Sequence, residues 1–163
     1  MEPKSPRDMP NVPWITRSGT LDPGKFPIDS VLRQTLSRRL EEFRSGCMIL
    51  CSMVAHGRVE AGIYLLGLLR HYHHDLPRLE VVVESLRSFR EDACATALFD
   101  ELRRVKASNT TRRYLDQVIR SLSSFPIEMV GAQFDDLAVD PSFSYRMRFK
   151  FAKAVDAMES EHV

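Results

Sequence analysis

The chain has 163 residues, of which 44% are hydrophobic and 28% charged, a composition typical of one domain with a sizeable core. Its formal net charge of +1 argues against a general polyanion binder but leaves room for a local basic patch. Three cysteines, an odd number in a chain too large to need disulfides, predict reduced thiols and a cytoplasmic protein. We expect no signal peptide in Met1–Pro13, which is polar and proline-rich, and no membrane span, because the longest apolar stretch is Ala61–Leu69.

The N-terminal segment is rich in proline. Residues 1–27 hold six of the nine prolines and show neither apolar period. We therefore expect residues 1–28 to form an extended, partly disordered arm, followed by a single all-α domain over residues 29–163. Within the arm, Trp14 either folds back onto the protein's own helices or acts as a docking anchor for another chain.

Beyond the arm, glycine and proline become scarce and helical signals follow one another. The first predicted helix is capped by Asp29 or Ser30, carries an apolar stripe with a period of about 3.6 residues and ends at Gly46. Further helices are predicted over residues 48–55, 58–72, 77–89, 92–105, 108–125, 128–138 and 141–159. The short loops between them predict antiparallel neighbours. No segment alternates as a strand would.

An internal repeat is the strongest pattern in the sequence. Residues 79–89 (LEVVVESLRSF) match residues 115–125 (LDQVIRSLSSF) at an offset of 36, and every apolar position has a counterpart. The next helices also match, ALFDEL at 97–102 with AQFDDL at 132–137, and residues 65–69 form a weaker echo upstream. A period of 33 to 36 residues with two helices predicts a short α-solenoid, in which stacked pairs share one core. The alternative is a non-repetitive helical bundle.

A family resemblance covers roughly half of the chain. The segment from Arg58 to Ala138 resembles HEAT-like repeats, especially the bacterial type also seen in phycobilin lyases. In those repeats a helix that opens with Asp and small residues, here Asp92-Ala93-Cys94-Ala95, alternates with a helix striped by Leu and Val. The resemblance implies a scaffold that binds protein or nucleic acid along one curved face, and it implies no catalytic residues.

Two groups of residues are candidates for chemistry. In the segment 71–75 (HYHHD), His71, His74 and Asp75 are candidate metal ligands or an acid/base group, but no second pair at ligand spacing exists, so we expect no metal and no cofactor. The alternative is that histidines in the last helical turn offset the helix dipole. The three cysteines, Cys47, Cys51 and Cys94, are interpreted either as a thiolate site or as small buried thiols.

Basic side chains are the better functional lead. If second helices of successive pairs line one face, the basic residues of two helices merge into one stripe that favours phosphates or an acidic partner; they are Arg112, Arg113, Arg120, Arg146, Arg148, Lys150 and Lys153. The alternative is a solvated surface with i,i+4 pairs such as Arg112 with Asp116. Aromatic residues of the last helix predict either a cap on the stack or a homodimer contact.

We therefore expect a non-enzymatic protein-protein interaction module, a small helical-repeat adaptor that binds a protein partner. A first alternative is a nucleic-acid-binding helical-repeat protein that uses the basic stripe. A second alternative is an enzyme or cofactor-handling protein with its site at residues 71–75. No membrane association is expected.

Overall fold

The computed structural model describes residues 13–161, and within them the chain is helical. The elements are α1 (Ile28–Gln34), α2 (Leu40–Ala55), α3 (Val59–His71), α4 (Leu76–Ser85), the 3-10 turn η2 (Leu86–Ser88), α5 (Asp92–Arg104), α6 (Arg112–Leu122), α7 (Ile127–Val139) and α8 (Tyr145–Ser160). Among these residues the only strand-like pairing is an isolated bridge between Ile15 and Leu21. The all-α class is confirmed. None of the helices in this part of the chain is long and apolar enough to span a bilayer.

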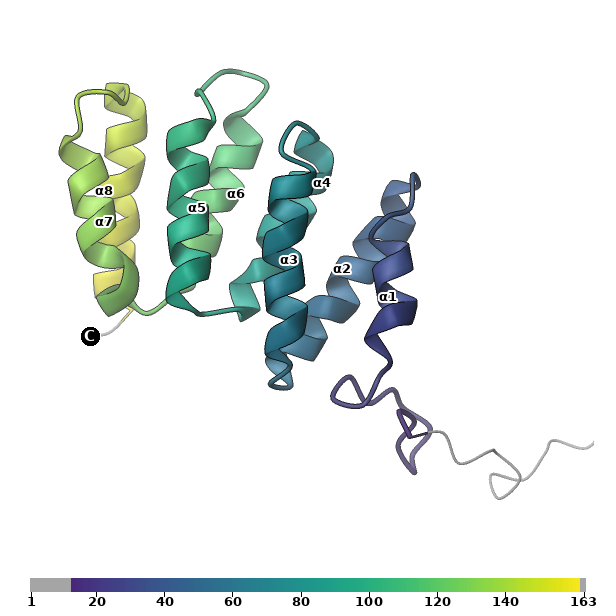
Figure 1. Cartoon of the computed structure of the whole chain (residues 1–163). Helices are drawn as coiled ribbons and strands as arrows, with labels where there is room; N and C mark the ends of the chain where they lie inside the picture. Colours follow the sequence, from purple (N-terminus) through teal and green to yellow (C-terminus); the bar gives the residue numbers. More distant parts are fainter. Residues whose placement is uncertain (1–12, 162–163) are drawn as a thin grey trace, which may run out of the picture.

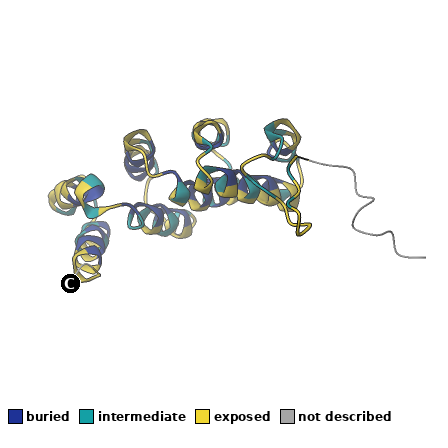
Figure 2. Ribbon diagram, turned by 90° about the horizontal axis from the view of Figure 1, so that it is seen from below, coloured by how far each residue is buried: buried dark blue, intermediate teal, exposed yellow. Residues whose placement is uncertain are grey.

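The helices stand in two rows (Figures 1 and 2). With the labels of Figure 1, one row holds α1, α3, α5 and α7, and the other holds α2, α4, α6 and α8. In the second row α4 packs directly against both α2 and α6, whereas α1, α3 and α5 touch one another far less. This closer spacing puts α2, α4 and α6 on the inner side of the curved stack. At its end α8 packs closely on α7 but makes little contact with α6, so the inner row opens between α6 and α8.

The matched segments of the sequence occupy neighbouring helices. Residues 79–89 form α4 and η2, residues 115–125 form α6 and its last turn, and α4 packs on α6. Nine of the ten residues in the five matched apolar pairs are buried, and Ile119 is half-buried. The matched helices α5 and α7 also meet, because the rings of Phe99 and Phe134 pack edge to face with centroids 5.1 Å apart. Equivalent residues therefore pack into one shared core.

The predicted first helix from residue 29 to residue 46 is wrong, because the chain leaves the helix between α1 and α2. The hydroxyl of Thr35 donates to the carbonyl of Leu32 at 2.7 Å, and the hydroxyl of Ser37 accepts from the backbone N–H of Arg39 at 3.1 Å. Such local bonds compete with the helical hydrogen-bond ladder and end α1.

Two glycines allow helices and rings to approach closely. Gly46, predicted to end a helix, is buried in the middle of α2, where an added Cβ would lie 2.9 Å from the Cβ of Gln34. Gly62 in α3 faces the ring of Phe89, and a Cβ there would come within 2.4 Å of it. Both glycines are therefore required by packing rather than by a turn.

The described part of the N-terminal arm packs on its own chain. The ring of Trp14 lies edge to face against Phe26, with centroids 6.3 Å apart. The guanidinium of Arg58, at the start of α3, donates to the carbonyl of Phe26. Trp14 thus contacts Phe26, which lies just before α1 in its own chain. Residues 1–12 of the predicted arm lie outside the described residues.

Candidate functional site

A buried polar clamp fixes α5 to the start of α6. The hydroxyl of Tyr114 donates to Oε2 of Glu101 at 2.6 Å, and Arg104 donates to both carboxylate oxygens, from Nε at 2.9 Å and from Nη2 at 2.6 Å. Tyr114 is fully buried and Glu101 is 7% exposed. Burial, followed by the bond to Glu101, raises the pKa of Tyr114 above its ordinary value, so its proton stays in place at neutral pH. The clamp holds the loop 105–111 between the two helices.

On the other side, the start of α8 is set by its cap. The hydroxyl of Ser144 accepts from the backbone N–H of Met147 at 3.3 Å, and Met147 is buried. Just before it, the carboxylate of Asp140 accepts from the backbone N–H of Ser142 at 2.8 Å, and bonding to Ser142 lowers the pKa of Asp140. The loop 140–144 is therefore held in a defined conformation opposite the loop 105–111.

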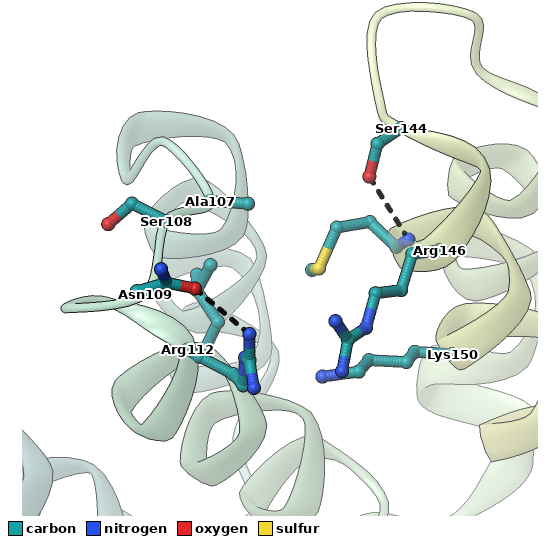
Figure 3. A pocket seen from close by; sticks show the side chains of 9 residues that line it. Ala107, Ser108, Asn109, Arg112, Ser144, Arg146 and Lys150 are labelled. Carbon is teal, nitrogen blue, oxygen red and sulfur yellow. Dashed lines mark hydrogen bonds between the residues drawn. The ribbon is translucent and has the colours of Figure 1, made fainter.

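A pocket of about 180 Å³ lies between α6 and α8. Arg112 of α6 faces Arg146 and Lys150 of α8 across it (Figure 3). Nη2 of Arg112 donates to Oδ1 of Asn109 at 3.0 Å, and Lys150 forms an ion pair with Asp116 of α6. Within residues 13–161, neither Arg112 nor Arg146 has a carboxylate partner. The remaining lining residues are Ala107, Ser108, Leu115, Ser144 and Met147.

A second and larger pocket, of about 530 Å³, adjoins the first. It shares Ala107, Leu115, Ser144 and Met147 with the first pocket, so the two are parts of one depression between the loops 105–111 and 140–144. Its apolar lining includes Leu102, Val105, Leu115, Phe143 and Met147, and its charged lining residues are Arg103, Arg104, Lys106 and Asp140. We call the two pockets together the α6–α8 groove.

Six of the seven predicted basic residues line three adjoining depressions around α6 and α8. Arg112, Arg146 and Lys150 line the groove, and Lys153 lies farther along α8 beside Lys150. Arg148 lies on another side of α8, because residues two apart in a helix point about 200° apart; it stands near Asp140.

The other two predicted residues, Arg113 and Arg120, line an adjoining charged depression on the α4 side of α6. It shares Asn109 and Arg112 with the basic pocket and also holds the carboxylates of Glu80, Glu84 and Asp116. Arg113 forms an ion pair with Glu80 of α4 at 3.0 Å, and Arg120 donates to Gln117 at 3.4 Å. The pairing of Arg112 with Asp116 anticipated from the sequence is wrong, because Asp116 pairs with Lys150 instead.

The histidine segment serves a helix boundary. His71, His73 and His74 are exposed, and Asp75 is engaged by Arg78, whose backbone N–H and Nη1 donate to it at 3.1 and 2.8 Å. Nδ1 of His73 lies 3.0 Å from the carbonyl of Arg70 in the last turn of α3. No group of three or more His, Cys, Asp or Glu side chains within residues 13–161 is arranged to hold a metal ion, so the candidate ligands His71, His74 and Asp75 are not brought together as a site.

Two of the three cysteines, Cys47 and Cys94, lie in the core, and Cys51 is half-buried on α2. Cys47 and Cys94 are fully buried, and burial raises the pKa of each thiol to about 12. Sγ of Cys51 lies 3.0 Å from the hydroxyl of Ser88. Thiols that hold their protons so firmly are weak nucleophiles and metal ligands at neutral pH, which favours the buried-thiol interpretation.

Comparison of the chain with family models, with curated proteins and with solved structures finds no significant match. The HEAT-like resemblance therefore stays a prediction.

Proposed function

We propose that this protein is a non-enzymatic binding module, a short α-solenoid of antiparallel helix pairs, which binds an acidic segment of a partner protein in the α6–α8 groove. The observation that carries the proposal is that Arg112 and Arg146 converge on one pocket without a carboxylate partner among the described residues. The solenoid part of the proposal is supported by the two rows of helices and by the contact between the matched helices α4 and α6.

Electrostatics favours an anionic ligand in this groove. Two guanidinium groups that face each other across a narrow pocket repel, and a carboxylate between them replaces that repulsion with charge-assisted hydrogen bonds. Arginine keeps its charge at all physiological pH values and presents a planar fork that matches a carboxylate. These groups bind and orient a ligand, and none of them is a nucleophile paired with a base.

The adjoining apolar pocket favours a protein ligand. It offers Leu102, Val105 and Phe143 beside the basic pocket, and both are open to the same groove. Protein interfaces commonly place an apolar anchor in a pocket with charged groups around it. A short peptide that carries an acidic residue near an apolar residue satisfies both pockets at once.

Fluorescence anisotropy with a labelled synthetic peptide of alternating Glu and Leu tests the proposal. We expect binding that weakens as salt rises, because the contacts include solvent-accessible charges. The double variant Arg112→Gln, Arg146→Gln should weaken binding about tenfold or more, and the control Arg70→Gln, Arg90→Gln, which neutralises two exposed arginines outside the groove, should leave it unchanged. An equal loss of affinity in both double variants would show that binding of the peptide depends only on the net charge of the protein, and it would reject the groove as the site.

A nucleic-acid-binding function is the second candidate, favoured by a specific observation on α8. Tyr145 is 77% exposed and Phe149 is 58% exposed, one helical turn apart and beside basic residues of the same helix. Exposed aromatic rings among basic residues are a platform on which single-stranded bases stack. Titration with a labelled oligothymidylate tests this candidate: affinity that falls in Tyr145→Ala, Phe149→Ala supports it, and no binding at low salt removes it.

The same two exposed aromatic rings also support the proposal that two copies of the chain form a homodimer through α8. Sedimentation equilibrium of the unmodified chain and of Tyr145→Ala, Phe149→Ala tests it, since a dimer through α8 should dissociate in the variant and a monomeric unmodified chain would reject it.

A further inference from the structure

The basic pocket of the groove carries two positive charges in excess. Arg112, Arg146 and Lys150 line it, and the single carboxylate that pairs with any of them, among the described residues, is Asp116, bound to Lys150. A peptide carboxylate brings one negative charge and leaves one guanidinium uncompensated. A phosphate monoester brings about 1.5 to 2 negative charges at neutral pH and several acceptor oxygens, so it matches the excess.

We propose that this pocket holds the phosphate group of a phosphorylated side chain in the partner protein, an inference that rests on the proposed function and names its ligand. Arg112 donates from one wall and Arg146 from the other, with Lys150 below them (Figure 3). The phosphorylated residue lies in the basic pocket, and an apolar neighbour in the partner's sequence fills the adjoining pocket beside Val105 and Phe143.

The polar groups around the three cations fit a tetrahedral oxyanion. The hydroxyl of Ser144 borders the pocket and can donate to a phosphate oxygen, while Oδ1 of Asn109 holds the guanidinium of Arg112 in orientation at 3.0 Å. The first turn of the 16-residue helix α8 also borders the pocket, and the partial positive charge of a helix N-terminus adds to the field of the side chains.

The surroundings of the pocket favour a phosphorylated side chain over a nucleic acid. Among residues 13–161, no aromatic ring lines the basic pocket, so a nucleobase attached to the phosphate has no stacking partner from these residues there. The exposed rings of Tyr145 and Phe149 are not part of its lining. A backbone phosphodiester carries one charge and two bulky substituents, whereas a monoester enters a pocket of about 180 Å³ with a single attached chain.

The test uses the full chain, uniformly labelled with nitrogen-15, and four probes followed in amide correlation NMR spectra. The probes are N-acetyl-phosphoserine N-methylamide, its aspartate counterpart, inorganic phosphate and a short oligothymidylate. We expect the phosphoserine probe to shift the amides of residues 108–112 and 144–147 saturably, with at least about tenfold higher affinity than the aspartate probe. Arg112→Gln and Arg146→Gln should each weaken binding of the phosphoserine probe about tenfold, and the control Arg70→Gln should not weaken it.

Four outcomes overturn the inference: no saturable shift with the phosphoserine probe, equal affinity for the phosphoserine and aspartate probes, binding of inorganic phosphate with exclusion of the phosphoserine probe, or tighter binding of the oligothymidylate at these amides. The variants replace exposed residues, so an unchanged amide spectrum of each apo variant verifies its fold. If the phosphoserine probe fails while the acidic peptide still binds in the groove, the inference fails alone. If neither binds, the proposed function fails with it.

Discussion

Replacing Tyr114 by Phe removes one hydroxyl from the clamp between α5 and α6 and leaves the ring in place. The hydroxyl donates to Glu101 at 2.6 Å in a fully buried position, and a hydrogen bond to a charged group contributes about 1.5 to 3 kcal/mol. Glu101 keeps both bonds from Arg104, so its carboxylate is not left without a partner. We therefore expect the free energy of unfolding to fall by about 2 kcal/mol, toward the lower end of that range.

Urea unfolding followed by far-ultraviolet circular dichroism measures this loss. The slope of the free energy of unfolding against urea concentration should not change, because the fold is retained. The melting temperature should fall by about 4 to 8 °C, the shift expected for a chain of this size. Tyr145→Phe is the matched control: its hydroxyl is on a residue 77% exposed, and the free energy should stay within about 0.5 kcal/mol of that of the unmodified protein. A loss for Tyr114→Phe as small as that of the control would refute the clamp.

Two further perturbations test the core. Gly62→Ala should destabilise the protein by about 1 to 3 kcal/mol, because the added Cβ would overlap the ring of Phe89. Gly67→Ala in the same helix has open space around it and should stabilise the protein by about 0.5 to 1 kcal/mol. Melting temperatures of the two variants that shift in the same direction would contradict this. The thiols of Cys47 and Cys94 have pKa values raised from 9.0 to about 12, so the unfolded chain releases these protons first. The stability they contribute is therefore fully present below pH 9.0 and is lost as pH rises toward about 12, by up to about 1.4 kcal/mol per pH unit for each thiol. Urea unfolding between pH 9.0 and about 12 should show that the free energy of unfolding falls less steeply with pH in the double variant Cys47→Ala, Cys94→Ala than in the unmodified protein. An equally steep fall would count against the raised pKa values of these two thiols.

The helical pattern was predictable where apolar residues recur at helical spacing. Residues 79–89 and 115–125 lie in neighbouring helices because burying one ridge requires a matching ridge beside it, and the sequence displays both. The break between α1 and α2 was not predicted, since the apolar stripe runs through it. It is set by the hydroxyls of Thr35 and Ser37, residues that are compatible with a helix until tertiary packing brings the two helices together at Gly46.

The candidate site was predictable only in part. Arg112, Arg146 and Lys150 were identified from their charge, but their convergence depends on how far α8 stands from α6, which long-range packing on α7 decides. The locally basic sequence predicts Arg148 as part of the same stripe, although helical geometry already separates it from Arg146.

The apolar half of the groove was not foreseen. Val105 and Phe143 lie at loops on different helix pairs, and no local pattern links them. The nearest signal in the sequence is Ser144, a residue type that caps helices, which stands directly before a basic and aromatic helix.

A charge-reversal experiment tests the central claim, that the α6–α8 groove selects its ligand by charge. The double variant Arg112→Glu, Arg146→Glu is titrated with the labelled Glu-Leu peptide and with a matched peptide in which Lys replaces every Glu. We predict that the unmodified protein prefers the acidic peptide and that the variant prefers the basic one, each by about tenfold or more. An unmodified protein that does not distinguish the two peptides, or a variant that keeps the original preference, would contradict the account.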